Sequence, residues 1–141
     1  MKVCKAFKFD AAHFLPGYEG RCANLHGHTW NLEVELEGPI DRKTGMVLDF
    51  AKLKKTVNNL VIDRLDHTCL NDLPADFNRM PTCENILLWI ADQLKPHDCY
   101  AFKLSRLRLY EGLESFAEMD FPTSDLVEGL SIKNLGVVVK V

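Results

Sequence analysis

The sequence predicts an α+β fold, an antiparallel sheet with two helices packed on one of its faces. Three observations lead to this prediction. Apolar and polar residues alternate in two segments near the start of the chain, which is typical of strands with one buried face. Two segments with helical spacing follow, and a further alternating segment comes after them. Helices that lie between antiparallel strand pairs cover one face of a sheet, so the other face is left exposed.

The first two predicted strands are joined by a long loop. The first strand covers residues 1–13, where the apolar side chains fall on odd positions. The second covers residues 29–37, where they fall on even positions: Trp30, Leu32, Val34 and Leu36. Residues 14–25 contain proline and glycine and no periodic pattern, which indicates a loop long enough to be functional. The two strands are therefore expected to pair as a hairpin.

Two helices are predicted in the middle of the chain. Asp49 is suited to cap the first, whose helical spacing continues to about Arg64. Thr82 is suited to cap the second, and Pro96 ends it. Residues 65–80 between the helices contain turn-forming residues and no periodic pattern.

A third alternating segment follows the helices. It covers residues 100–111, and three of its side chains share the inward face: Leu107, Leu109 and Glu111. Beyond it, residues 120–129 are rich in turn formers, and residues 135–141 form a short apolar run that suits an edge strand. We therefore expect one domain at residues 1–119 and a C-terminal extension at residues 120–141.

Composition and charge exclude several classes of protein. The 141 residues fit one domain, and 47% hydrophobic with 26% charged residues is close to the globular average. The net charge of −3 provides no basic surface for nucleic acid, and no apolar run of about 18 residues is present to span a membrane. The five cysteines form no C-x-x-C pair and follow no secretory signal, so we expect a cytoplasmic protein with free thiols.

Three histidines are the candidates for a metal site. His26 and His28 are two apart on a strand and share the inward face of Trp30, while His13 continues the inward face of the first strand. A hairpin would bring all three together at its loop end. Three imidazoles with an open fourth position are typical of catalytic zinc, and Gly27 is expected to allow close approach of metal or backbone. A single inward histidine is more often a core residue with a hydrogen-bond partner than a metal ligand, and it is the three together that favour a metal site.

Three further positions have chemically useful neighbours. Cys22 precedes His26 by four residues, where zinc would favour a thiolate that acts as base or nucleophile. The alternatives are a loop cysteine of no consequence or a fourth zinc ligand. His67 follows Asp66 and can be tuned for proton transfer, or is simply a histidine at a helix end. Glu111 either binds a ligand with paired N–H donors or is a solvated strand end.

These motifs together resemble the 6-pyruvoyl-tetrahydropterin synthase superfamily. The resemblance covers roughly residues 5–119 and rests on Cys22-Ala23-Asn24-Leu25-His26-Gly27-His28, Ala12-His13, Leu65-Asp66-His67, Pro81-Thr82-Cys83-Glu84 and the strand that ends in Glu111. The gap between Cys22 and His26 is three residues long. It resembles the gap in the bacterial 6-carboxy-5,6,7,8-tetrahydropterin synthases of queuosine biosynthesis, whereas pyruvoyl-type enzymes have a longer one. Gly112 departs from the family, which often has threonine after the glutamate.

The resemblance implies a fold, an assembly and a reaction. The family has the tunnelling fold, in which trimers close their sheets into a barrel and two trimers stack as a homohexamer. The reaction would convert 7,8-dihydroneopterin triphosphate to 6-carboxy-5,6,7,8-tetrahydropterin, acetaldehyde and triphosphate. The alternatives are the sister 6-pyruvoyl-tetrahydropterin synthase, which eliminates triphosphate without carbon–carbon cleavage, and a zinc-containing pterin-binding protein. An unrelated zinc hydrolase is disfavoured, because no glutamate lies near the His-x-His pair.

The resemblance also implies residue roles. Zn²⁺ would be bound by His13, His26 and His28. Cys22 would be the general base, and Asp66 and His67 would relay protons, in one subunit or across a subunit boundary. Glu111 would bind the N–H edge of the pterin. Beside these, Arg21 is the nearby candidate for contact with the triphosphate.

Overall fold

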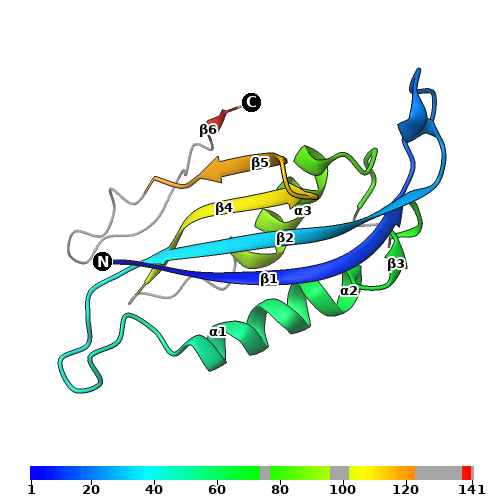
Figure 1. Cartoon of the computed structure of the whole chain (residues 1–141). Helices are drawn as coiled ribbons and strands as arrows, with labels where there is room; N and C mark the ends of the chain where they lie inside the picture. The colour runs from blue at the N-terminus through cyan, green and yellow to red at the C-terminus, as the bar shows by residue number, and fades with distance from the viewer. Residues whose placement is uncertain (74–76, 96–101, 123–137, 141) are drawn as a thin grey trace.

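The structure is a computed structural model that describes residues 1–73, 77–95, 102–122 and 138–140 (Figure 1). Its centre is a six-stranded sheet with the strand order β3-β1-β2-β4-β5-β6. The strands are β1 (Lys2–His13), β2 (His26–Glu37), β3 (Thr68–Cys69), β4 (Lys103–Glu111), β5 (Ser115–Asp120) and β6 (Val138–Lys140).

The sheet is antiparallel except at one edge. β1 and β2 pair along their whole length as the predicted hairpin, which places His13 opposite His26. β4, β5 and β6 continue the antiparallel order. β3 instead runs parallel to β1, with Thr68 opposite Ala11. The expectation of a purely antiparallel sheet was therefore wrong, because a two-residue strand is too short to show an alternating pattern in the sequence.

Two helical segments begin where the sequence predicts. α1 (Phe50–Val57) is capped by Asp49, whose carboxylate accepts from the Ala51 N–H at 2.7 Å. It continues through a π-helical stretch, η2 (Asn58–Ile62), into α2 (Asp63–Leu65). α3 (Cys83–Leu94) is capped by Thr82, whose hydroxyl accepts from the Asn85 N–H at 3.3 Å. Two short 3₁₀ turns, η1 (Arg21–Ala23) and η3 (Leu70–Asp72), lie in the connections.

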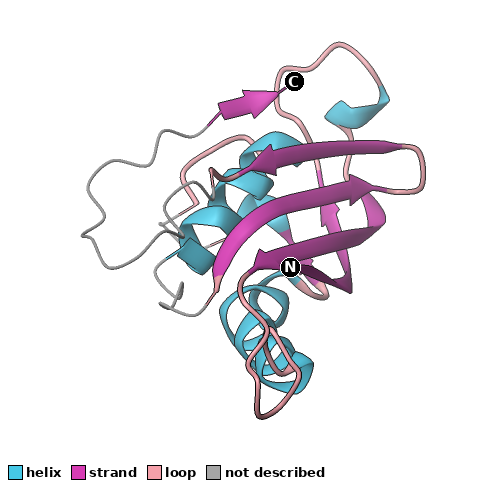
Figure 2. Ribbon diagram, turned by 90° about the vertical axis from the view of Figure 1, so that its left-hand side faces the viewer, coloured by secondary structure: helices cyan, strands magenta, loops and turns pink. Residues whose placement is uncertain are grey.

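The helices cover one face of the sheet, and the core lies between them (Figure 2). The inward side chains follow the predicted phase, odd on β1 and even on β2, and the rings of Phe9 and Trp30 stack with centroids 6.0 Å apart. The opposite face holds a network of ion pairs, here called the charged face: Lys2, Glu33, Glu35, Arg106, Arg108 and Glu118.

The C-terminal part is described only at its end. β6 pairs with β5 at the edge of the sheet, which confirms the edge strand expected within residues 135–141. Residues 123–137, which include most of the predicted turn-rich segment, lie outside the described residues. Within the described parts of the chain, no helix has the length and apolar character needed to cross a membrane.

Candidate functional site

β1 ends and β2 begins at the same end of the sheet (Figure 1). The hairpin pairing brings the side chains of His13, His26 and His28 together there. The ring centroids of His13 and His26 are 4.6 Å apart, those of His26 and His28 are 4.9 Å apart, and those of His13 and His28 are 5.2 Å apart. One ring nitrogen from each side chain lies within 4.8 Å of the others. This cluster is able to hold a metal ion.

Two backbone carbonyls orient the imidazole rings. His13 Nδ1 lies 2.7 Å from the Pro81 carbonyl oxygen, and His26 Nδ1 lies 2.8 Å from the Asn24 carbonyl oxygen. A carbonyl only accepts, so each Nδ1 carries a proton, and in the neutral imidazole each Nε2 then keeps its lone pair. Nε2 of His13 and of His28 is buried without a hydrogen-bond partner among the described residues. Metal-binding histidines have this arrangement, in which the second nitrogen donates to a fixed acceptor.

Glu111 reaches the same centre from the end of β4, where it lies opposite Trp30. Its Oε1 is 3.2 Å from His13 Nε2 and 3.8 Å from His28 Nε2. The neighbouring His13 lowers the pKa of Glu111 more than burial raises it. Burial lowers the pKa of His13, but Glu111 and the Pro81 carbonyl outweigh that effect and the pKa is raised. Burial lowers the pKa of His28. Glu111 is therefore a carboxylate that faces the imidazoles.

Cys22 and Arg21 lie outside the histidine cluster, in the short turn η1. Cys22 is half-buried and Arg21 is exposed. The Leu15 N–H donates to the Cys22 carbonyl oxygen at 2.8 Å and closes the loop upon itself. Cys22 is not in any group of metal-binding side chains among the described residues, so the geometry does not support a fourth zinc ligand at this position.

Asp66 and His67 form a second group, together with Asp10. His67 Nδ1 lies 2.9 Å from Asp66 Oδ2, although the two residues are adjacent in the chain. This contact occurs where the His67 backbone takes the left-handed φ of 58°. The Asp10 N–H, which donates to Asp66 at 2.9 Å, is the main cause of the lowered pKa of Asp66. Asp10 lies opposite Thr29, one position from His28, so the group lies on the other face of the sheet.

An open hollow of about 570 Å³ lies beside this second group. Gly27 contributes to its wall, together with Asp10, His28, Thr29 and His67. A methyl group at Gly27 would come no closer than 3.8 Å to another part of the chain, the Ala11 carbonyl oxygen. No approach of the chain's own backbone therefore requires glycine at position 27, and the expected close approach of a metal stays a prediction.

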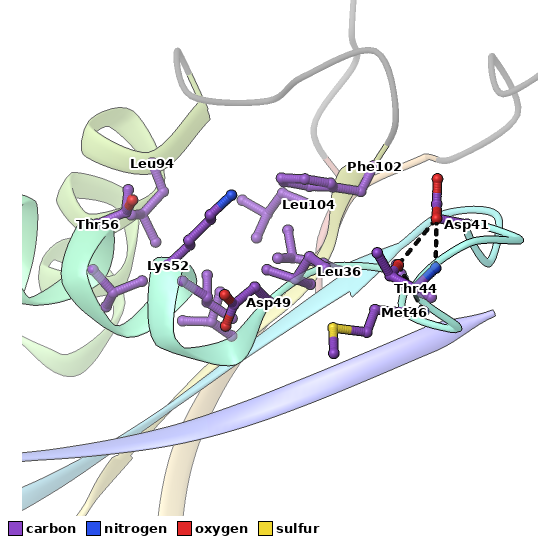
Figure 3. A pocket seen from close by; sticks show the side chains of 15 residues that line it. Leu36, Asp41, Thr44, Met46, Asp49, Lys52, Thr56, Leu94, Phe102 and Leu104 are labelled. Carbon is purple, nitrogen blue, oxygen red and sulfur yellow. Dashed lines mark hydrogen bonds between the residues drawn. The ribbon is translucent and has the colours of Figure 1, made fainter.

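Another cavity, of about 590 Å³, lies between α1 and the sheet (Figure 3). Leu36 of β2 lines it, ten positions and therefore about 33 Å along the strand from His26. Its wall is mainly apolar, and Asp41 beside it accepts from the Thr44 N–H at 2.8 Å. The cavity lies at the opposite end of the sheet from the histidines and shares no residue with either titratable group.

Sequence reasoning missed three contributors to the site. The backbone carbonyl groups of Pro81 and Asn24 orient His13 and His26. Every residue has such a carbonyl, so the sequence does not show which ones act in this way. Asp10 was not singled out, because one acidic residue on the polar face of a strand is ordinary. The parallel pairing of β3 with β1 brings Asp66 and His67 beside Asp10, and a two-residue strand gives no sequence signal for that pairing.

The comparisons with known proteins point to one family. The family model described as 6-pyruvoyl tetrahydropterin synthase matches residues 2–121. The chain is 37% identical to a 6-carboxy-5,6,7,8-tetrahydropterin synthase of Haemophilus influenzae, over 83% of this chain and 96% of that protein. It is 44% identical to a dihydroneopterin monophosphate aldolase of Pyrococcus furiosus, over 80% of this chain and 91% of that protein.

The solved structures give the same result for the fold. The Caenorhabditis elegans 6-pyruvoyl tetrahydropterin synthase is similar with a TM-score of 0.75 and 28% identity, over 85% of this chain and 94% of that one. These relatives are named as pterin enzymes, and the match extends through the strands that hold the histidines and Glu111. The chain therefore belongs to the 6-pyruvoyl tetrahydropterin synthase family of enzymes.

Proposed function

We propose that this protein is a zinc-dependent carbon–carbon lyase that converts 7,8-dihydroneopterin triphosphate and one water molecule to 6-carboxy-5,6,7,8-tetrahydropterin, acetaldehyde and triphosphate. The observation that carries the proposal is the convergence of three imidazoles in a chain of this family. Two features favour this branch: the three-residue gap between Cys22 and His26, and relatives that are named 6-carboxy-5,6,7,8-tetrahydropterin synthase.

His13, His26 and His28 would hold the zinc ion, because their ligand nitrogens lie within 4.8 Å of one another and the buried Nε2 atoms of His13 and His28 make no hydrogen bond among the described residues. Zinc bound there would make the side-chain hydroxyls of the substrate more acidic. The Pro81 and Asn24 carbonyls keep two of the rings in the tautomer with a free Nε2. The orientation of the Nε2 atoms of His13 and His26 is thereby fixed before substrate binds.

The remaining residues would bind the pterin and move protons. The Glu111 carboxylate would accept two N–H groups from the guanidine-like edge of the pterin. Cys22 would take a proton from the substrate side chain as a thiolate, and Arg21, exposed beside it, would contact the triphosphate. His67, held by Asp66, would transfer the second proton. Because that pair is not in the histidine cluster, we propose that it serves the site of a neighbouring subunit in a trimer or a dimer of trimers.

A second candidate follows from the aldolase relative at 44% identity. A retro-aldol cleavage of a dihydroneopterin monophosphate would leave a hydroxymethyl group on the pterin, and the same metal and base would serve it. The sister reaction to a 6-pyruvoyl product is the third possibility, since a relative in Drosophila melanogaster has that name. The three products differ in mass.

The test is an incubation of zinc-loaded protein with dihydroneopterin triphosphate and, separately, with the monophosphate. Mass spectrometry of the products is expected to show 6-carboxytetrahydropterin with acetaldehyde, from the triphosphate only. A pyruvoyl or hydroxymethyl product would replace the proposed reaction by the sister reaction or the aldolase. No turnover of either compound at full zinc occupancy would overturn the proposed catalysis in favour of pterin binding.

Three further parts of the proposal concern the setting of the enzyme. We propose a role in queuosine biosynthesis and a cytoplasmic location, the latter supported by five cysteines without a C-x-x-C pair. The division into a synthase domain at residues 1–119 and an extension at residues 120–141 also stays a proposal. The family match to residue 121 supports it.

A further inference from the structure

Asp10 holds both members of the proposed proton relay through its backbone. Its N–H donates to Asp66 Oδ1 at 2.9 Å, and its carbonyl oxygen accepts from the His67 N–H at 2.6 Å. His67 has a left-handed backbone at φ 58°, a conformation that costs free energy unless neighbouring contacts fix it. The bonds to β1 supply such contacts.

The Asp10 side chain is fixed as well. Its Oδ1 accepts from the Thr29 hydroxyl at 2.6 Å, and Thr29 is the residue opposite Asp10 on β2. One carboxylate oxygen of Asp10 lies within 4.8 Å of a ring nitrogen of His67 and of a carboxylate oxygen of Asp66. All three side chains border or adjoin the hollow beside Gly27. Two carboxylates thus flank one exposed imidazole.

We propose that Asp10 is a positioning residue for proton transfer by His67, with Thr29 as the group that orients its carboxylate. The inference rests on the proposed function, in which His67 exchanges a proton with the substrate. The proton moves between substrate and the free ring nitrogen of His67, and both carboxylates stay ionised throughout. No bond to Asp10 forms or breaks; its negative charge stabilises the imidazolium that His67 becomes.

Two observations indicate more than a structural role for the side chain. The backbone bonds that fix Asp66 and His67 need no particular residue at position 10, so they do not explain an acidic side chain there. Asp10 is exposed, and no Lys or Arg pairs with it among the ion pairs of the described residues. Its carboxylate accepts from the Thr29 hydroxyl and has an oxygen within 4.8 Å of the ligand atoms of Asp66 and His67, and no cation among the described residues is paired with it.

The test compares Asp10→Asn, which keeps the shape and the acceptor for Thr29 but removes the charge, with wild type under zinc saturation. We expect kcat to fall about tenfold, less than the 10²–10⁴-fold contribution of a proton-transfer group itself, while KM and zinc content stay unchanged. Asp120→Asn makes the same change at an exposed position of β5 and is expected to leave kcat unaltered.

The Thr29 variants provide the second measurement. Thr29→Val removes the hydroxyl and is expected to lower kcat severalfold, whereas Thr29→Ser keeps the hydroxyl and wild-type kcat. In an Asp10→Ala background, Thr29→Val is expected to cause no further loss, because the group it orients is gone. If Asp10→Asn folds poorly, the comparison of Thr29→Val with Thr29→Ser is sufficient to test the role of Asp10.

These outcomes distinguish a failure of the role proposed for Asp10 from a failure of the proposed function. An active wild type in which Asp10→Asn keeps kcat within twofold would overturn the role of Asp10 and leave the proposed function standing. Equal losses in Thr29→Val and Thr29→Ser, or a fall in kcat that follows zinc loss, would overturn it too. A wild type without turnover would instead reject the proposed function.

Discussion

His13 shows how much of the site depends on single residues. It is 1% exposed, its Nδ1 lies 2.7 Å from the Pro81 carbonyl oxygen, and its Nε2 lies 3.2 Å from Glu111 Oε1. One side chain thus joins the end of β1, the start of α3 and the candidate metal centre. A change at this residue would disturb packing and metal binding together, so the more exposed His26 and His28 are better test positions.

We expect His26→Ala and His28→Ala each to abolish stoichiometric zinc binding, because two imidazoles cannot supply a tridentate site. Zinc content per chain after dialysis, measured by inductively coupled plasma mass spectrometry, checks this. His67→Ala is the matched control, since that histidine lies in the other group. Full zinc retention in both cluster variants would contradict the assignment of the centre.

Glu111→Gln is expected to keep zinc and to raise KM for the pterin substrate tenfold to about a hundredfold. The amide of glutamine presents an N–H to the N–H edge of the ligand and removes the negative charge. Substrate kinetics together with zinc analysis of the same sample measure the effect. Loss of zinc would show instead that the carboxylate, 3.2 Å from His13 Nε2, is a metal ligand.

At the scale of elements, the strength of the sequence pattern decided what could be predicted. Long alternating runs predicted β1 and β2, and cap residues predicted where α1 and α3 begin. β3 has two residues, and β5 carries exposed Phe116 on its outer face, so neither shows a clear alternation. The π-helical stretch η2 depends on backbone hydrogen bonding that residue types do not report.

The cap of α1 gives a prediction at this scale. Asp49→Ala is expected to lower the free energy of unfolding by about 1 kcal/mol, because the Ala51 N–H loses its acceptor. Asp49→Asn retains an acceptor and is expected to stay close to wild type. Urea denaturation measures both. Since α1 lies away from the histidines, a loss of activity per folded molecule in Asp49→Ala would contradict this purely structural account.

At the scale of the whole molecule, the charged face links four strands through ion pairs. Glu35 is 9% exposed and contacts Lys2 at 3.1 Å, Arg106 at 3.0 Å and the Ser105 hydroxyl at 2.9 Å. Burial raises its pKa, but these partners outweigh burial and the pKa is lowered. A depressed carboxylate pKa adds stability above the unfolded pKa, and that stability is lost as pH falls through the folded pKa.

Glu35→Gln is therefore expected to cost about 1–3 kcal/mol of stability at pH 7 and progressively less as the pH falls below about 4. Chemical denaturation at a series of pH values measures the difference. Glu37→Gln, on the same strand, is the control and is expected to change little, because the described residues show no ion pair for Glu37. A cost independent of pH would contradict the role given to the Glu35 charge.

The site was predictable where it depends on the pattern within one hairpin, and not where it depends on contacts between elements that are distant in the chain. The phase of β2 predicts that His26 and His28 face inward, and hairpin pairing then adds His13. Nothing local predicts that Pro81, 68 positions from His13, supplies its acceptor, or that β3 returns to the edge of β1. These contacts depend on how separate elements dock, which residue spacing does not report.

The placement of all three proposed metal donors within residues 13–28 has a consequence for biosynthesis. The hairpin of β1 and β2 is synthesised before α1, α3 and β4. The donor set is therefore complete while translation continues, whereas the Pro81 carbonyl and Glu111 arrive later. A cation captured at this stage would lock the register of the nascent hairpin, since a one-residue slip would move the histidines to the opposite face. The ion would thus help to template the sheet onto which the helices later fold.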